Sequence, residues 1–330
     1  MNETKFPHNA KKNWIGVDVG GTKTAIVLCS EPPIILERVA FPTLPEQGPQ
    51  RALDTIQKTI HQLIQKHGLA PADIAAIGVS CGGPLDRVAG VIQSPPNLPN
   101  WDNVPIVSTL QREFGVDCRL ENDANAGAVA EHRFGAGKGT QHMIFLTMGT
   151  GFGAGIIADG RLYHGVSDTA GEIGHVRLTS SGPIGYNKAG SVEGWASGGG
   201  MAQTAVQQVK AATEKGEVTS LAAQLATNKT LTAKDVADAA RQGDAVAKRI
   251  VHSTAERLGE ALAILVDLLN PELIVIGGLA MRFGDSLLAP ARIVMQREAL
   301  DVPARACKVV PAALGEQIGD IAAICVAMGF

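Results

Sequence analysis

The chain has 330 residues, more than one hydrophobic core usually supports, so we expect two domains. A formal net charge of −3 argues against a nucleic-acid-binding surface and favours a small-molecule partner. The sequence shows neither the apolar core of a signal peptide nor eighteen consecutive apolar residues, which predicts a cytoplasmic protein without a membrane partner. Its five cysteines form no CxxC pair, so we expect buried thiols rather than disulfides or a cysteine zinc site.

Residues 14–28 read as an apolar run, a glycine turn and a second apolar run, the pattern of a hairpin that folds around a phosphate. The turn holds Gly20, Gly21, Thr22 and Lys23, which offer backbone N–H groups, a hydroxyl and a cation. Asp18 precedes the turn and is placed to hold Mg²⁺ or one of its waters, since Mg²⁺ binds few carboxylates plus substrate oxygens. The alternative is a plain β-turn with an exposed lysine.

Further elements are predicted from hydrophobic periodicity and turn residues. In the first half they are a strand at 34–41, a helix at 50–67, a strand at 74–80, a helix at 123–134, a strand at 143–148 and a hairpin through Asp159-Gly160. In the second half they are helices near 199–212, 232–242 and 244–270, a strand at 273–278 and a final helix from Gly319. The strand at 143–148 ends in a second glycine turn at 149–153. A glycine-bearing hairpin in each half predicts an internal duplication of a β-rich unit.

Two motifs favour other enzyme classes and are weighed against their structural context. The second turn fits the dinucleotide fingerprint G-x-G-x-x-A, but that fingerprint requires a helix next, and β-branched residues with a hairpin turn come instead. Residues 78–82 match the G-x-S-x-G elbow of hydrolases, which also requires a helix. Gly82-Gly83-Pro84 comes next and disfavours that helix, so we interpret Ser80 as a strand-end residue beside a ligand cleft.

The cluster at 121–126, ENDANA, predicts both a helix start and a catalytic group. Asp123 is interpreted as a general base that accepts a hydroxyl proton, with Asn122 holding another hydroxyl of the same substrate. An N-cap role for these side chains, worth ~1 kcal/mol, is compatible with this function.

Two glycine-rich stretches carry further polar side chains, with Glu172 and His175 in one and Glu193 in the other. A lone Glu or His on a loop is usually a solvated or structural group. Taken with the cluster at 121–126, they form a set suited to several hydroxyls of one small polyol.

The motifs together resemble the ROK family (repressors, open reading frames and kinases), bacterial sugar kinases of the actin and hexokinase superfamily. The resemblance runs from Trp14 to Phe330 and rests on motifs in the family's order: DVGGTK at 18–23, GGPLD at 82–86, PPNLPNW at 95–101, ENDANAGAVAE at 121–131, GTGFGAGI at 149–156, AGEIGH at 170–175 and VIGG at 275–278. It implies an α/β fold of two ribonuclease-H-like domains, with mixed sheets flanked by helices around a central cleft.

The resemblance also implies roles and boundaries. Asp123 would be the catalytic base; sugar contacts would come from Gly83, Asn97, Asn122, Glu172, His175 and Glu193; and ATP with Mg²⁺ would face Asp18, Gly20, Gly21, Thr22, Lys23, Thr150, Gly151, Gly277 and Gly278. We expect a polar tail at 1–12, a small domain at 13–120 with a C-terminal helix at 315–330, a larger domain at 121–314, and a homodimer.

One departure concerns zinc. Many members carry, after GEIGH, a CxCGxxGCxE segment whose cysteines bind structural zinc together with that histidine. Here residues 184–193 read IGYNKAGSVE, so every cysteine position is filled by another residue. Zinc needs thiolate or imidazole ligands, and we therefore predict none.

The sequence thus predicts ATP-dependent phosphorylation of a hexose hydroxyl, with the 6-hydroxyl of glucose as the expected acceptor. The alternative is a catalytically weak sugar-binding sensor of the same fold, although the short polar start leaves no room for a helix-turn-helix module before the first strand. A hydrolase using Ser80 ranks third. The sequence leaves open which sugar and hydroxyl are used, the phosphate donor and the dimer surface.

Overall fold

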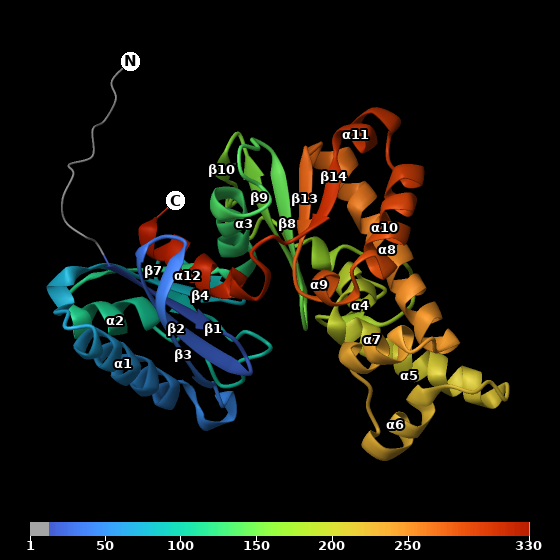
Figure 1. Cartoon of the computed structure of the whole chain (residues 1–330), viewed down its shortest axis with the longest axis horizontal. Coiled ribbons are helices and arrows are strands. Elements are labelled where there is room, and N and C mark those ends of the chain that lie inside the picture. The colour runs from blue at the N-terminus through green and yellow to red at the C-terminus, as the bar shows by residue number, and fades with distance from the viewer. Residues whose placement is uncertain (1–12, 330) are drawn as a thin grey trace. The chain divides into compact units, whose positions relative to one another are not determined.

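The computed structural model describes residues 13–329, and the predicted polar tail at 1–12 lies outside the described residues (Figure 1). The chain divides into two compact units. The first unit contains the described residues up to Ala126 and those from Glu316 onward, and the second unit is Gly127–Gly315. The domain boundaries and roles expected from the sequence stay predictions. Within residues 13–329, no helix is both long and apolar enough to cross a membrane.

The first unit is built on a five-stranded mixed sheet in the order β3-β2-β1-β4-β7. Its strands are β1 (Asn13–Val19), β2 (Lys23–Glu31), β3 (Ile34–Pro42), β4 (Ile74–Cys81) and β7 (Asp117–Asn122), with a small ladder of β5 (Leu85–Asp86) and β6 (Val91–Ile92). The first three strands are antiparallel neighbours, whereas β1, β4 and β7 run parallel. Its helices are α1 (Pro49–Lys66), α2 (Ile106–Phe114), α12 (Ile318–Met328) and the start of α3 (Asp123–Phe134).

The second unit repeats this sheet order with β10-β9-β8-β13-β14. Its strands are β8 (Met143–Met148), β9 (Phe152–Ala158), β10 (Arg161–Leu162), β13 (Leu273–Ile276) and β14 (Lys308–Pro311), and a separate hairpin is formed by β11 (Ile184–Gly185) and β12 (Lys188–Ala189). Its helices are α4 (Val192–Ala196), α5 (Gly198–Glu214), α6 (Ser220–Asn228), α7 (Ala233–Arg241), α8 (Ala245–Leu269), α9 (Leu279–Phe283), α10 (Asp285–Glu298) and α11 (Asp301–Ala306). In each sheet three antiparallel strands are extended by two parallel strands.

This repeated order confirms the predicted duplication and the predicted α/β class with two mixed sheets flanked by helices. The predicted helices and strands are present with boundaries close to those expected; for example, Asp244 caps α8 by accepting hydrogen bonds from the N–H groups of Val246 and Ala247 at 3.0 Å. The structure adds elements that the sequence analysis did not predict, namely the helices α2, α4, α6, α9, α10 and α11, the strands β7 and β14 and the short strands β5, β6, β11 and β12. After the second glycine turn comes the antiparallel strand β9, as expected, and not the helix of a dinucleotide fold.

Helices cover both faces of the first sheet. Ile15, Val17 and Val19 alternate along β1 and pack with apolar residues of α1 and α2 in one buried cluster. The intervening positions of β1 face α12 instead. A Cβ on Gly16 would lie 2.9 Å from the Cβ of Ala323, and one on Gly78 in β4 would lie 2.1 Å from the backbone nitrogen of Ala327. The missing side chains therefore let the backbone of α12 rest directly on the sheet.

This contact generates a stability prediction. Gly78→Ala is expected to lower the free energy of unfolding by about 3 kcal/mol, because overpacking against backbone atoms cannot be relieved by a rotamer change. Ala75→Ser, at a half-buried position of the same strand, is the control and should change it by less than about 0.5 kcal/mol. Chemical denaturation followed by circular dichroism measures both, and equal stability of the two variants would contradict close packing of α12.

Candidate active site

The carboxyl ends of β1, β4 and β7 meet at one edge of the first sheet because these strands are parallel. The register places Asp18 beside Ser80, Ser80 beside Glu121, and Cys81 beside Asn122. Residues just beyond the strand ends are therefore brought together although they are far apart in the sequence. The Asp18 turn, the glycines after β4 and the start of α3 all lie at this edge.

Asp123 is the first residue of α3, directly after β7. One carboxylate oxygen, Oδ1, accepts a hydrogen bond from the N–H of Ala124 at 2.8 Å, while Asn122 Oδ1 accepts from the same N–H at 2.9 Å. The other oxygen, Oδ2, lies 3.9 Å from the place where a Cβ on Gly82 would be. The residue is exposed to solvent on one side, yet the desolvation imposed by the surrounding protein raises the pKa of Asp123.

Asn122 is held in turn by the buried Glu121. The N–H of Asn122 donates to Glu121 Oε1 at 2.9 Å, and the amide of Asn125 donates to the same oxygen at 3.0 Å. A Cβ on Gly83 would lie 3.3 Å from the Asn122 amide nitrogen, so the loop after β4 passes close to this side chain. The expected capping role of this cluster is confirmed, and a fixed amide is presented beside Asp123.

Asn97 is brought to the same edge by a loop with two buried anchors. Leu98 and Trp101 are fully buried, whereas Asn97 itself is exposed. A Cβ on Gly82 would lie 3.8 Å from the amide of Asn97, and one on Gly21 would lie 2.5 Å from its carbonyl oxygen. The first unit therefore gathers Asn97, Gly83, Asn122 and Asp123 from three separate segments, as a substrate site requires.

The phosphate-type turn after β1 is braced by Thr43. Its hydroxyl donates to the carbonyl oxygen of Gly20 at 2.6 Å, and its N–H donates to the carbonyl oxygen of Thr22 at 3.1 Å. The N–H of Gly20 donates to the carbonyl oxygen of Lys23 at 3.1 Å, which closes the turn. Thr22 and Lys23 are exposed, so a hydroxyl and a cation are available there to a ligand.

Asp18 lies among other carboxylates. Burial and the charges of Asp123 and Asp320 raise the pKa of Asp18 to about 7, and the positive charges of Lys23 and Arg38 oppose the increase. A Cβ on Gly319, in the first turn of α12, would lie 2.5 Å from Asp18 Oδ2. The neighbouring Asp320 is buried and forms an ion pair with Arg38, with 2.6 Å between Oδ2 and Nε.

Gly319 and Asp320 were not predicted to belong to this site. They are separated from Asp18 by most of the chain, and only one sequence signal marks them. An acidic residue in the otherwise apolar helix IGDIAAICVAM indicates a buried charge that needs a partner.

In the second unit, the turn at 149–151 and the two glycines after β13 also lie at one sheet edge, because β8 and β13 run parallel. The N–H of Gly198, at the start of α5, donates to the carbonyl oxygen of Gly149 at 2.7 Å. Gly277 donates to the carbonyl oxygen of Leu146 at 2.9 Å, and a Cβ on Gly278 would lie 2.2 Å from that of Met148. The predicted pairs Thr150-Gly151 and Gly277-Gly278 are thus brought together.

Glu193 lies against the same turn. Its Oε2 accepts a hydrogen bond from the N–H of Phe152 at 3.1 Å and lies 2.9 Å from the place of a Cβ on Gly151. Glu172 and His175 are exposed at η3 (Ile173–His175), a short helix that packs against α4 and β9. The structure therefore places these three side chains around one neighbourhood of the second unit.

The competing motifs find no support in the geometry. Ser80 is buried inside β4, and the chain continues through Gly82 and Gly83 into β5 rather than into a helix, so the hydrolase elbow is absent.

The five cysteines are buried free thiols, as expected. Residues 13–329 contain no group of three or more His, Cys, Asp or Glu side chains arranged to hold a metal ion, and the expected lack of zinc stays a prediction.

Comparisons with known proteins show which family the chain belongs to. The chain is 35% identical over 310 residues to a glucokinase of Halalkalibacterium halodurans, covering 93% of this chain and 92% of that protein. It is 36% identical over 284 residues to a glucokinase of Thermotoga maritima, covering 86% of each. The structure of a ROK family glucokinase from Streptomyces griseus in complex with glucose and AMPPNP matches with a TM-score of 0.80 and 31% identity, covering 96% of this chain and 99% of that one. Because the model of the ROK family also matches residues 14–329, the chain belongs to the ROK family.

Proposed function

We propose that this protein, an ATP-dependent sugar kinase, transfers the γ-phosphoryl group of ATP to the 6-hydroxyl of glucose with Asp123 as general base. The observation that carries the proposal is the position of Asp123, whose Oδ2 and the side-chain amide of Asn97 both lie within 4 Å of the place of a Cβ on Gly82. The raised pKa strengthens Asp123 as a proton acceptor, which suits a general base. The similarity to glucokinases supports glucose as the substrate.

In this mechanism Asp123 accepts the proton of the sugar hydroxyl. The hydroxyl oxygen then bonds to the γ-phosphorus while the bond from that phosphorus to the β,γ-bridging oxygen breaks, and ADP leaves with the electron pair. Little covalent work remains for the protein beyond positioning and charge neutralisation. We assign positioning of the sugar to its hydroxyl-binding side chains, namely Asn97, Asn122, Glu172, His175 and Glu193, with the backbone of Gly83.

The nucleotide is assigned to the two glycine turns and the glycines after β13. In the first unit Gly20, Gly21, Thr22 and Lys23 would face the phosphates. In the second unit Thr150 and Gly151 would do the same, and Gly277 with Gly278 would lie beside adenosine. Exposed N–H groups at glycine turns and an exposed ammonium are suited to phosphate oxygens.

Mg²⁺ that arrives with ATP has a fitting partner in Asp18. Neighbouring carboxylates disfavour the charge on Asp18 when no cation is near, so a divalent ion there would be bound by a carboxylate whose repulsion it relieves. Bound Mg²⁺ would neutralise charge on the transferring phosphoryl group. The homodimer and the cytoplasmic location stay predictions.

The function is tested by ADP release, coupled to NADH oxidation, across a panel of monosaccharides with ATP and Mg²⁺. We expect the highest kcat/KM with glucose and 6-phosphorylated product by ³¹P NMR. Sugar binding without ADP release across the whole panel would instead identify a sensor, and preference for another hexose would correct the substrate.

Asp123→Asn tests the base. Because the amide cannot accept the hydroxyl proton, kcat should fall by roughly 10²–10⁴, with a much smaller change in the KM for sugar. Asp54→Asn, on the exposed face of α1, is the matched control and should behave like the wild type. Wild-type turnover of Asp123→Asn would exclude this mechanism.

Asp18→Asn tests whether the ionised carboxylate of Asp18, the proposed partner of Mg²⁺, destabilises the folded protein. The pKa of Asp18 is higher in the folded protein, about 7 against 3.8, so its protonated form stabilises the fold at low pH and this contribution is lost as the pH rises through 7. Without nucleotide and Mg²⁺, Asp18→Asn should therefore raise the apparent Tm by several degrees at pH 8 and change it far less at pH 5. Differential scanning calorimetry measures both Tm values. A lower Tm of the variant than of the wild type at pH 8 would contradict the expectation, because the ionised carboxylate would then stabilise the fold.

A further inference from the structure

The segment between η3 and α4 packs against α4 and contacts Glu193. It begins after His175 and returns to Glu193, so both of these predicted sugar contacts lie at its ends. The N–H of Val192 donates to the carbonyl oxygen of Val176 at 2.8 Å, which ties the two ends together. We call residues 176–191 the site loop. The orientation of Glu193 depends on what holds this loop against α4.

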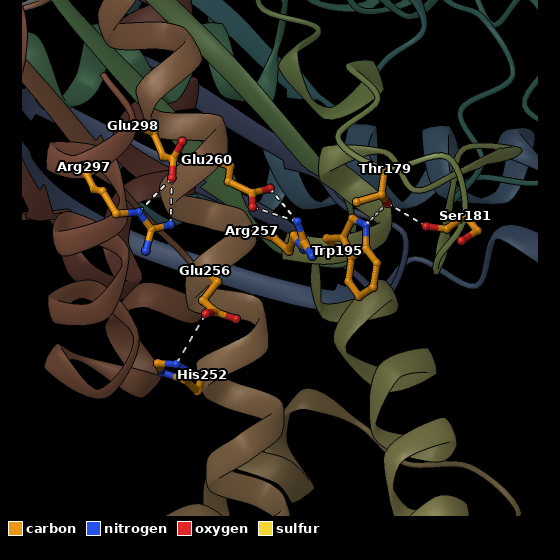
Figure 2. A network of polar contacts seen from close by, with 9 residues as sticks. All are labelled: Thr179, Ser181, Trp195, His252, Glu256, Arg257, Glu260, Arg297 and Glu298. Atoms are coloured by element: carbon orange, nitrogen blue, oxygen red, sulfur yellow. Dashed lines mark hydrogen bonds and ion pairs between the residues drawn. The ribbon is translucent and has the colours of Figure 1, made fainter. Parts of the chain in front are cut away.

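Trp195 on α4 is a side-chain tether of the site loop (Figure 2). Gln203 on α5 is a second one, since its amide exchanges hydrogen bonds with the N–H and the carbonyl oxygen of Ile184 at 2.9 and 2.8 Å. The indole Nε1–H of Trp195 donates to Thr179 Oγ1 at 2.8 Å, and the Thr179 hydroxyl donates to the carbonyl oxygen of Ser181 at 2.6 Å. A Cβ on Gly182 would lie 2.4 Å from the indole ring, so the loop backbone rests on the aromatic side chain. Trp195 thus holds the loop both through a hydrogen bond and through packing.

The other side of Trp195 is anchored to the core. The guanidinium of Arg257, on α8, lies 5.2 Å from the centroid of the indole ring, within the range of a cation–π contact. Arg257 is itself held by Glu260, with distances of 2.7 and 2.9 Å from Nη1 to the two carboxylate oxygens (Figure 2). The 25-residue helix α8 supplies many buried side chains to the second-unit core, so Arg257 projects from a well-packed helix.

Glu193 shares α4 with Trp195, and α4 has only five residues. So short a helix is not stable by itself and takes its orientation from its contacts. Ser191 caps it by accepting a hydrogen bond from the N–H of Gly194 at 3.1 Å. A Cβ on Gly185 would lie 2.7 Å from the Cβ of Glu193, so the site loop also rests on the glutamate. A shift of the loop relative to α4 would therefore move Glu193.

We propose that Trp195 and Thr179 are positioning residues, whose hydrogen bond holds the site loop and α4 in the arrangement that fixes Glu193 for a sugar hydroxyl. This inference rests on the proposed function, because it assigns Glu193 to sugar binding. Neither residue needs to contact the sugar itself. The turn at 20–23 belongs to the other unit, whereas the turn at 149–151 contacts Glu193 directly, so the effect on sugar binding is measured separately from the effect on ATP.

Thr179→Val tests the proposal because it keeps the shape of the side chain and removes the acceptor of the indole N–H. Loss of one partly buried hydrogen bond should weaken glucose binding by roughly five- to thirty-fold, with kcat within about twofold. Thr179→Ser restores the hydroxyl and should return glucose affinity to within about threefold of the wild type. Thr227→Val, which removes an exposed threonine hydroxyl from α6, is the matched control and should have no effect.

Glucose affinity is measured by isothermal titration calorimetry as well as by kinetics, so the inference does not depend on turnover. A Thr179→Val protein with wild-type glucose affinity would overturn the inference, even if its Tm fell, because the bond would then be merely structural. A wild-type protein that binds glucose without releasing ADP would overturn the proposed function and leave the calorimetric comparison to judge the positioning role. If the wild type binds no sugar of the panel, both are overturned.

Discussion

The gathering of carboxylates at one edge of the first sheet is the constraint that explains most of the site. Asp18, Asp123 and Asp320 lie close enough that the charges of the other two raise the pKa of Asp18. A fold does not place like charges together for stability, since each raises the cost of ionising the next. The parallel strand ends and the close packing of α12 impose this arrangement, and Arg38 and Lys23 offset only part of the repulsion. Binding a divalent cation or a proton would relieve the repulsion between these carboxylates. In the proposed reaction the cation would arrive as Mg²⁺ with ATP, and the proton would come from the sugar hydroxyl.

The duplicated sheet provides the same geometry twice. In each unit, a glycine turn joins the first two strands of the antiparallel part, and the next parallel strand ends beside it. The two copies differ in the residues that come after these strand ends. In the first unit this edge carries Asp123 and its neighbouring amides, whereas in the second unit it carries a glycine turn supported by α5 and the glycines after β13. One topology therefore supports a cluster of carboxylates and amides in one copy and glycine turns in both.

Much of the fold is encoded by local pattern. The hairpins around Gly20-Gly21 and Gly149–Gly153, the capped helix at Asp123 and the Asp244 cap all depend on neighbouring residues, and each is present. The polar side chains at 121–126, 172–175 and 193 could be grouped from their chemistry. Gly83, Asn97, Gly277 and Gly278 were added only through the resemblance, because spacing does not show which strand ends are parallel neighbours. The features that were missed are long-range: Gly319 and Asp320 reach Asp18 from the last helix, and Trp195 reaches Thr179 across a loop. Helix α10 was also missed, since Pro290 in its interior obscures the helical pattern.

The most direct test of Asp123 as the base is a crystal structure with glucose and a non-hydrolysable ATP analogue with Mg²⁺. We expect an oxygen of Asp123 to lie within hydrogen-bonding distance, about 3 Å, of the 6-hydroxyl of glucose. We also expect Glu193 on another hydroxyl and the metal or one of its waters on Asp18. A complex in which the carboxylate of Asp123 contacts no sugar hydroxyl would contradict the role given to this residue.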